Sequence, residues 1–396
     1  MSTRPCRVEI RTQAVEHNYR FLQRLAAPDA DLLAIVKADA YGHSLALCAP
    51  AAVRAGARWL GVTSVEEGIA ARAVCPGADT RVLVIGGVFP GQGGAVMQHH
   101  LTVVAWEPWQ LDELRAAASA AGALPGSVPV HLEIDTGMSR QGASPEALAA
   151  LFTWFAPASP LRLEGVMTHL FAPDEAGGQV TAEQLALLNQ ILGRIASAGL
   201  FAEWLSVGNS AALLAGQART IGDLAATHGM KAMLRPGLAL YGLVPRFDPD
   251  FDQEPAALVA ARAALQPVLS WKSAVVGVRA VPAGAVVGYN GTFVATEPMR
   301  LALVALGYAD GLDRKLGNRF SLLVRGERAP VVGRISMDQS VLDVTEISGV
   351  EAGDEVVILG TQGSGCITAF DHADATGTIP WEVFTRIGQR VRRVAV

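Results

Sequence analysis

The chain has 396 residues, of which 51% are hydrophobic and 17% charged, and its formal net charge is -5. At roughly 150 residues per domain, this length predicts two or three domains, and the composition excludes a disordered chain. The slightly acidic balance, without a basic cluster, excludes an electrostatic footprint for DNA or RNA, and no apolar run approaches the ~18 residues of a membrane span. We therefore expect a small-molecule substrate and neither a nucleic-acid nor a membrane partner.

The N-terminus and the cysteines indicate the compartment. Residues 1–7 contain no apolar segment of the secretory type, so we expect a cytoplasmic protein. Four scattered cysteines without CxxC spacing argue against a disulfide framework and against a structural zinc site. They are Cys6, Cys48, Cys75 and Cys366. We expect these cysteines to be packing residues, and we expect no bound metal.

Strand-like apolar runs alternate with helix-like segments from about residue 12 to residue 240. The eight runs span residues 32–36, 59–63, 81–85, 101–105, 128–134, 163–168, 204–207 and 232–234. Eight such alternations favour a closed barrel over an open sheet. The sequence therefore predicts an α/β fold with an N-terminal parallel (β/α)8 barrel.

The segments between these runs carry helix start and stop signals. Two capping-box pairs and one serine–proline start are present: Ser64 with Glu67, Thr181 with Gln184, and Ser144 with Pro145. Gly199 is expected to end a helix that has apolar residues along one face. These residues are Leu185, Leu188, Leu192 and Ile195.

The alternation of strand-like and helix-like segments ends at about residue 245. A polar connection at residues 247–252 leads into short β-like runs that are separated by glycine and proline turns. These runs include residues 341–344 and 355–359 and the alternating stretch around Val276 and Val278, and residues 325–328 resemble a hairpin turn. We therefore expect a barrel domain over residues 10–245 and a mainly-β domain over residues 246–396. An N-terminal strand within residues 1–9 is expected to belong to the β domain.

Lys37 closes the first apolar run. A lysine at the buried end of a strand is poorly solvated, and desolvation lowers the pKa of its amine. A neutral amine attacks carbonyl groups. The alternative is that Lys37 merely lies at a strand end and extends its amine to water.

Barrel geometry brings Lys37 together with other polar residues. Active sites of such barrels lie at the C-terminal ends of the strands, and the loops after the seventh and eighth strands usually bind phosphate. The residues that follow the strand ends are Lys37, Arg140, His169, Asn209, Ser210 and the segment Arg235-Pro236-Gly237. A lysine, a phosphate cradle and two arginines at one rim indicate pyridoxal phosphate as the cofactor.

Each of these residues also has an ordinary structural interpretation. Asn209 and Ser210 could begin a helix as its N-cap, and His169 could be a satisfied core histidine. Arg140 and Arg235 could form salt bridges at the rim.

The motifs resemble those of the alanine racemase family, the fold-type III pyridoxal-phosphate enzymes, over nearly the whole chain. They are Val8-Glu9-Ile10, residues 13–19, residues 36–43, residues 135–140, Thr168-His169, Gly208-Asn209-Ser210, residues 235–238, residues 287–292, residues 307–311 and residues 333–338. The resemblance implies a homodimer with shared active sites that interconverts L- and D-alanine for peptidoglycan.

The resemblance also implies the catalytic pair. Lys37 would bind the cofactor covalently and act as one base, and the partner subunit's Tyr289 would act as the other base from the opposite face. Two opposed bases allow stereoinversion. His169 would bond Tyr289 and tune its basicity. Arg235 would bond the pyridine nitrogen and keep it unprotonated, which limits side reactions such as transamination.

The remaining implied contacts concern the phosphate and the substrate. The phosphate cradle would comprise Tyr41, Asn209, Ser210 and the backbone amides of Gly237 and Leu238. Arg140 would bond the phenolic oxygen of the cofactor and help to hold the substrate carboxylate, to which the partner subunit's Met337 would offer its backbone N–H. Asp338 would support that segment.

Three positions depart from the family pattern. Glu133 stands where many relatives have a carbamylated lysine, so we expect its carboxylate to hold Arg140 without carbon dioxide; the alternative is that Glu133 points elsewhere. Gln389 stands at the position of a phosphate-binding tyrosine, and Ser336 at a position that is often cysteine.

Four other functions remain to be weighed. Within the same family, the alternative is a racemase for serine or for a wider range of amino acids, because residues at the entrance of the site set the size of the substrate. A Schiff-base aldolase could use Lys37 on the substrate itself, and a non-catalytic pyridoxal-phosphate carrier would need neither Tyr289 nor a second domain. Decarboxylases of the same fold type would be expected to place an acid near the pyridine nitrogen, and Arg235 argues against them.

Overall fold

The structure is a computed structural model that describes residues 4–250 and 254–396. The chain forms two compact units. One comprises Gln13–Ala40 and Cys48–Pro267, and the other comprises the N-terminal segment up to Thr12, Tyr41–Leu47 and Val268–Val396. Residues 1–3 of the expected N-terminal strand and residues 251–252 of the expected connection lie outside the described residues.

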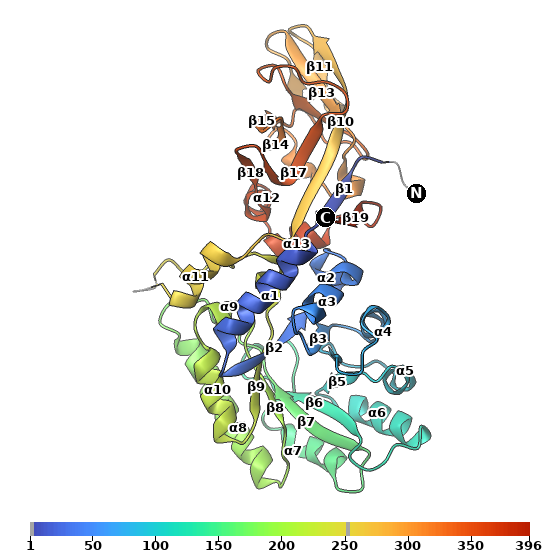
Figure 1. Cartoon of the computed structure of the whole chain (residues 1–396), viewed down its shortest axis with the longest axis vertical. Helices are drawn as coiled ribbons and strands as arrows, with labels where there is room; N and C mark the ends of the chain where they lie inside the picture. Colours follow the sequence, from blue (N-terminus) through green and yellow to red (C-terminus); the bar gives the residue numbers. More distant parts are fainter. Residues whose placement is uncertain (1–3, 251–253) are drawn as a thin grey trace. The chain divides into compact units, whose positions relative to one another are not determined.

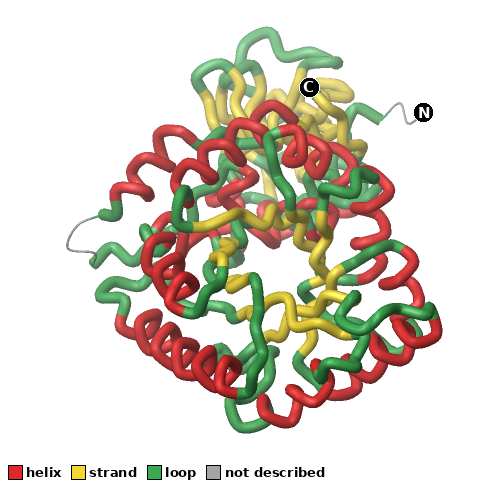
Figure 2. The backbone as a smooth tube through the Cα atoms, turned by 60° about the horizontal axis from the view of Figure 1, so that its bottom comes forward, coloured by secondary structure: helices red, strands yellow, loops and turns green. Residues whose placement is uncertain are grey.

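The first unit is a closed barrel of eight parallel strands. Figure 2 shows its strands encircled by helices. The strands are β2 (Ala30–Ile35), β3 (Trp59–Val62), β4 (Arg81–Val84), β5 (Thr102–Ala105), β6 (Val128–Glu133), β7 (Leu161–Met167), β8 (Trp204–Ser206) and β9 (Lys231–Leu234). Every residue of β3 and β5 is buried, because the strands of such a barrel are covered on both faces. The predicted fold is confirmed.

Helices surround this barrel. They are α1 (Thr12–Ala26), α3 (Leu45–Arg54), α4 (Val65–Val74), α5 (Gly93–Gln98), α6 (Pro108–Ala120), α7 (Leu148–Leu151), α8 (Gln179–Ser197), α9 (Ser210–Leu214), α10 (Ala218–Thr227) and α11 (Ala256–Ala264). The expected stop of α8 is correct, since Gly199 follows the helix with a φ of 74°.

The expected helix starts are only partly correct. Ser64 caps α4 by accepting the N–H of Glu67, at 3.3 Å. The pair Thr181 and Gln184 is not a capping box, because α8 begins earlier, at Gln179, and Thr181 lies inside the helix. Ser144 does not begin a helix either: it accepts the N–H of Ala147 across a turn, and α7 begins only at Leu148.

Charged and aromatic groups fill the interior of the barrel around Glu164 of β7. Its carboxylate accepts hydrogen bonds from Arg81 and Arg162, each at 2.9 Å. Burial raises the pKa of Glu164, but the nearby His131 ring and the hydrogen bonds from Arg81 outweigh that effect and lower the pKa to about 2. The fully buried His131 ring lies against Gly165, where an added Cβ would overlap it.

The second unit is mainly β, as predicted (Figure 1). Its nine-stranded sheet contains β1 (Arg7–Ile10), β10 (Leu269–Val281), β13 (Met299–Val304), β14 (Ser321–Val324), β15 (Glu327–Pro330), β16 (Ser340–Asp343), β17 (Glu355–Gln362), β18 (Gly365–Ile367) and β19 (Arg392–Ala395). A small ribbon pairs β11 (Val286–Val287) with β12 (Phe293–Val294), and α12 (Ala369–Thr376) and α13 (Pro380–Thr385) complete the unit. The expected hairpin is confirmed, because Arg325 and Gly326 join β14 to β15 with positive φ.

Two further observations concern the cysteines and the helices. Cys6, Cys48 and Cys75 are buried packing residues, but Cys366 is exposed, so the prediction for Cys366 is wrong. None of the helices within residues 4–250 and 254–396 combines the length and the apolar character that crossing a membrane requires.

Candidate active site

Lys37 lies just beyond the C-terminal end of β2. That strand ends at Ile35, and the N–H of Val36 donates to the carbonyl of Gly61, at 2.8 Å. Burial, and then the positive charges of Arg140 and Arg235, lower the pKa of the Lys37 amine. The amine is therefore biased toward its neutral form, which is both a nucleophile and a base.

The backbone after Lys37 turns in the left-handed direction. Ala38, Asp39 and Ala40 have φ between 52° and 56°, and Tyr41 continues the turn with a φ of 55°. Such angles are costly for residues with a Cβ and persist only where the surroundings hold them. Glu67 supplies part of this support, because its carboxylate accepts the N–H of Ala38 at 2.7 Å.

Glu67 and Tyr241 are supports that the sequence did not identify. The Glu67 carboxylate also accepts the N–H of Thr63, at 2.8 Å, so it ties the end of β3 to the turn after Lys37. The Tyr241 hydroxyl is fully buried and donates to the carbonyl of Ile35, at 2.8 Å. Both side chains fix the backbone on either side of Lys37.

Arg235 follows β9 and is buried. Its Nη1 donates to the carbonyl and the hydroxyl of Ser206, at 2.7 and 3.1 Å, and its Nη2 donates to the carbonyl of Thr168, at 2.8 Å, and to Nδ1 of His169, at 2.9 Å. The Nε–H finds no acceptor among the residues that the structure describes. Burial lowers the pKa of Arg235 to about 10, so the side chain is still a cation at neutral pH. One fixed N–H thus remains for a ligand.

His169 is held as a neutral ring. An arginine can only donate, so Nδ1 of His169 accepts and the proton must reside on Nε2. Burial, and then the positive charges of Arg235, Arg140 and Lys37, lower the pKa of His169 to about 3. Gln184 holds the backbone of His169 in place, because its side-chain amide donates to the carbonyl of His169 at 3.0 Å. This contact replaces the helix cap that was expected for Gln184.

The loops after β8 and β9 meet at Ser210. Its hydroxyl accepts the N–H groups of Gly237 and Ala239, at 2.9 and 3.1 Å. Leu238 follows Gly237 at the start of a short 3₁₀ turn, Leu238–Tyr241. Asn209 is the N-cap of α9 and accepts the N–H of Ala212, at 3.1 Å. Hydroxyl and amide groups therefore lie close together at this rim and suit an anion.

Glu133 ends β6 and is buried. Its carboxylate accepts a hydrogen bond from the Gln141 amide, which also donates to the carbonyl of Ile85, at 3.1 Å. Arg140 is exposed and has no hydrogen-bond partner among residues 4–250 and 254–396, so the expected bond from Arg140 to Glu133 is absent. Burial raises the pKa of Glu133, and the Gln141 bond and the charges of Arg235 and Arg140 only partly offset that rise. Gln141 was not identified from the sequence, although it directly follows Arg140.

Four of the predicted site residues lie in the other unit. Tyr289 is 68% exposed and Met337 is 53% exposed. Asp338 forms an ion pair with Arg390, at 2.8 Å. Tyr41 is the last residue of the left-handed turn, and burial raises its pKa to about 12.

Comparison with known proteins gives full-length matches. Residues 10–245 match the model of the alanine racemase N-terminal domain, and residues 268–395 match that of the C-terminal domain. An alanine racemase of Sorangium cellulosum is 37% identical over 401 residues, which are 98% of each chain.

Solved structures agree with these matches. Alanine racemase from D-cycloserine producing Streptomyces lavendulae has a TM-score of 0.86 and 36% identity, covering 100% of this chain and 98% of that one. Alanine racemase from Bartonella henselae with covalently bound pyridoxal phosphate has a TM-score of 0.82 and 26% identity, covering 99% of each chain. The predicted family resemblance is confirmed.

Proposed function

Because the chain belongs to the alanine racemase family, we propose that it interconverts L-alanine and D-alanine with pyridoxal phosphate as its cofactor. One observation carries the proposal: Lys37, Arg235 and Ser210 follow three strand ends of one barrel. The covalently bound cofactor in the enzyme from Bartonella henselae supports the same assignment.

The donor set at this rim fits the chemical groups of the cofactor. The Lys37 amine suits the aldehyde carbon, and the remaining Nε–H of Arg235 suits the ring nitrogen. The Ser210 hydroxyl and the N–H of Leu238 suit the phosphate, while the N–H of Gly237 is already bonded to Ser210. Tyr41 and Asn209 would complete this cradle. When bound, the cofactor withdraws electrons from the α carbon of the substrate and so acidifies its hydrogen.

Two bases move the proton. The neutral Lys37 amine removes or returns the proton on one face of the α carbon, and the phenol of the partner subunit's Tyr289 does so on the other face. His169 donates its Nε2–H to the phenol oxygen of Tyr289 and so favours its deprotonated form. The high exposure of Tyr289 in the single chain supports a homodimer in which a second copy covers it.

The substrate is held by its carboxylate. Arg140 is exposed and free to bond it, together with the phenolic oxygen of the cofactor, and the partner subunit's Met337 donates its backbone N–H. Glu133 places a negative charge behind Arg140 and Arg235 and limits the repulsion between them. The D-alanine formed is a building block for peptidoglycan, made in the cytoplasm.

The test compares Lys37→Ala with a matched control, Lys231→Ala, which removes an exposed lysine from the same barrel. Purified wild-type protein is incubated with pyridoxal phosphate and with L-alanine, D-alanine or L-serine, and the enantiomers are separated chromatographically. We expect wild type and Lys231→Ala to racemise alanine and to show the absorbance of the protein-bound cofactor, and Lys37→Ala to lose both.

Three results would count against the proposal. Alanine racemisation and cofactor absorbance in Lys37→Ala would overturn the role of the lysine. A colourless wild-type protein would favour the aldolase alternative. Equal rates on L-serine and L-alanine would replace alanine specificity with a broad substrate range.

A further inference from the structure

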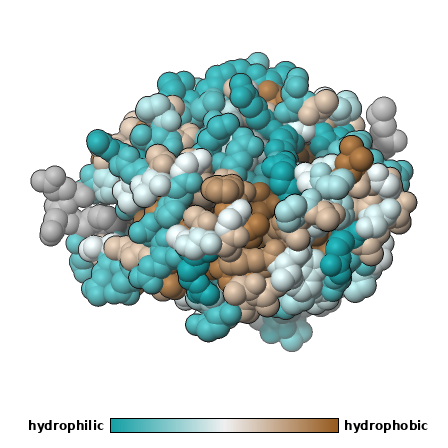
Figure 3. Space-filling model, turned by 90° about the horizontal axis from the view of Figure 1, so that it is seen from below, coloured by the Kyte–Doolittle hydropathy of each residue, from teal (hydrophilic) through white to brown (hydrophobic). Residues whose placement is uncertain are grey.

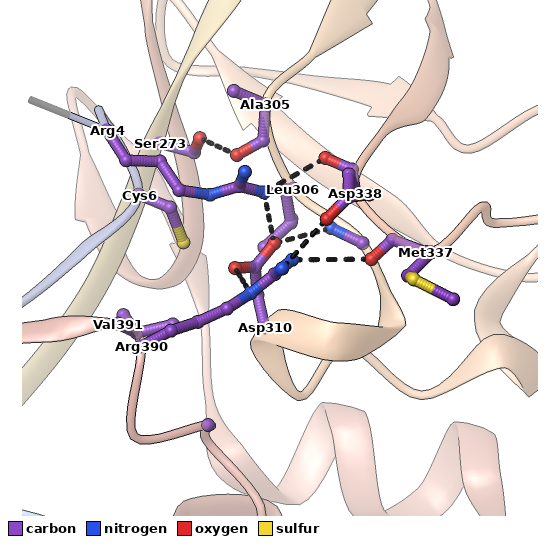
Figure 4. A network of polar contacts seen from close by, with 12 residues as sticks. Arg4, Cys6, Ser273, Ala305, Leu306, Asp310, Met337, Asp338, Arg390 and Val391 are labelled. Atoms are coloured by element: carbon purple, nitrogen blue, oxygen red, sulfur yellow. Dashed lines mark hydrogen bonds and ion pairs between the residues drawn. The ribbon is translucent and has the colours of Figure 1, made fainter.

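Asp310, in the second unit, is a fully buried carboxylate that accepts hydrogen bonds from three donors (Figure 4). Arg4 donates to its Oδ2 at 2.8 Å, Arg390 donates to its Oδ1 at 2.8 Å, and the N–H of Gly307 donates to its Oδ2 at 2.9 Å. A buried charge is tolerated only when it is paired in this way. The two arginines come from opposite ends of the chain, and their bonds to the same carboxylate fix them relative to each other.

Both arginines continue past Asp310 to the segment Met337-Asp338, as the dashed lines in Figure 4 show. Arg390 donates to the carbonyl of Met337, at 3.4 Å, and its Nη1 forms an ion pair with the Asp338 carboxylate, at 2.8 Å. Arg4 donates to the carbonyl of Asp338, at 3.1 Å. The planar guanidinium forks thus bind two successive residues of one loop.

The carbonyl side of Met337 is also held by the backbone. The N–H of Ala309 donates to this carbonyl, at 3.0 Å, and a Cβ at Gly307 would overlap it. The N–H of Met337, in contrast, donates to no acceptor within residues 4–250 and 254–396, and its side chain is half exposed. A donor that is free while its neighbours are bonded is preorganised for an anion.

We propose that Arg390, together with Asp310 and Arg4, is a positioning residue that fixes the Met337 N–H to receive the substrate carboxylate in the partner's active site. The inference rests on the proposed function, which gives that N–H its ligand. Arg390 itself touches neither substrate nor cofactor. Its effect therefore appears in the binding of the carboxylate and not in the proton transfers.

The first test is the kinetics of Arg390→Gln. The carboxylate contact is present both in the ground state and in the transition state, so we expect KM for alanine to rise about tenfold while kcat stays within about twofold. Arg390→Lys should give a smaller rise, because lysine supplies a point charge without the fork. Asp338→Asn, at an exposed position, removes one arm of the fork without disturbing Asp310. It should also raise KM.

A matched control is Arg325→Gln. Arg325 forms a comparable 2.8 Å ion pair with Asp354 in the same unit, at the turn between β14 and β15. We expect wild-type KM and kcat in this variant. A fall in kcat with unchanged KM in Arg390→Gln, or the same KM in all four variants, would overturn the positioning role.

The second test uses mixed dimers, because the proposal places the effect in the partner's site. When Arg390→Gln chains pair with Lys37→Ala chains, the one live site uses Met337 from an intact Arg390 network, so we expect wild-type KM. When wild-type chains pair with the double variant Lys37→Ala/Arg390→Gln, the one live site uses the altered network, and we expect the raised KM. The opposite assignment of KM values would place the effect of Arg390 within its own chain and overturn the proposal.

A binding measurement separates the carboxylate from catalysis. Sodium propionate, which has the carboxylate of alanine but no amine, is titrated calorimetrically into the wild-type and Arg390→Gln holoenzymes. We expect its Kd to rise about tenfold in the variant. Equal affinities would overturn the positioning role alone if the wild type racemises alanine, whereas a wild type that does not racemise alanine overturns the proposed function as well.

Discussion

Replacing Ala38 by glycine tests whether the left-handed turn after Lys37 stores strain. Ala38 has a φ of 53° and a ψ of 51°, and its side chain is exposed, so the substitution removes no buried contact. The left-handed conformation destabilises the folded state by about 1–2 kcal/mol when the residue has a Cβ, and glycine relieves this cost. Glycine in turn destabilises by about 0.5–1 kcal/mol, because it gives the unfolded chain more conformational entropy. The net effect of Ala38→Gly should be a gain of about 0.5–1 kcal/mol in the free energy of unfolding.

The control is Ala116→Gly, at an exposed position inside α6 of the same unit. There glycine should cost about 1 kcal/mol, as it does in ordinary helix interiors. The two variants should therefore differ by about 1.5–2 kcal/mol, which corresponds to about 3–8 °C in Tm for a unit of this size. Scanning calorimetry at one saturating concentration of pyridoxal phosphate measures both. An equal loss of Tm in the two variants would refute the strain.

Three further results are expected. Mixed dimers of Tyr289→Phe and Lys37→Ala chains should recover one intact site of two, and no activity in a preparation shown by mass to contain heterodimers would reject shared sites. Glu133→Gln removes the carboxylate charge that interacts with Arg235 and Arg140, so it should raise KM for alanine and lower kcat/KM about tenfold, or ~1.4 kcal/mol. Glu133→Lys should regain part of this loss only with bicarbonate, and unchanged kinetics in Glu133→Gln would contradict the role. Because the pKa of Glu164 is lowered from 4.5 to about 2 in the folded chain, its carboxylate stabilises the fold above 4.5 and loses that effect as the pH falls toward 2. The Tm of wild type should thus fall more steeply between about pH 5 and pH 3 than the Tm of Glu164→Gln, and parallel slopes would contradict this.

The barrel could be predicted because its signal is strong and local. The residues of β3, Trp59–Val62, are all buried, so their apolar character is visible in the sequence without any knowledge of their neighbours. The chain order of a parallel barrel then dictates that Lys37, His169 and Arg235 follow strand ends at one rim. Neither step requires a side-chain contact.

The supports of the site could not be predicted, because they depend on partners far away in the sequence. Gln184 fits a helix cap by spacing, yet its amide donates to the carbonyl of His169 in another loop. Glu67 likewise does not complete the expected capping box with Ser64, because its carboxylate accepts the N–H of Ala38, 29 positions away. Local pairs and distant pairs compete for the same side chain, and only the folded backbone decides between them.

The left-handed turn was missed for a related reason. Ala38 and Ala40 favour right-handed helices, and nothing in their local preference predicts a positive φ. Their conformation is a local cost that contacts elsewhere offset, such as the bond from Ala38 to Glu67. Expectations that are built from local preference fail where the chain departs from it.

The contact between His131 and Gly165 constrains the order in which the two positions can change. The imidazole fills the space that any side chain at 165 would need, so a first step from Gly165 to alanine meets a ring that is enclosed on every side. The reverse order, a smaller residue at 131 and then a larger one at 165, passes through a cavity and not through an overlap. Libraries that vary these sites one at a time should therefore recover far fewer folded chains than a library that varies both together. The effects of substitutions at positions 131 and 165 on stability should not be additive.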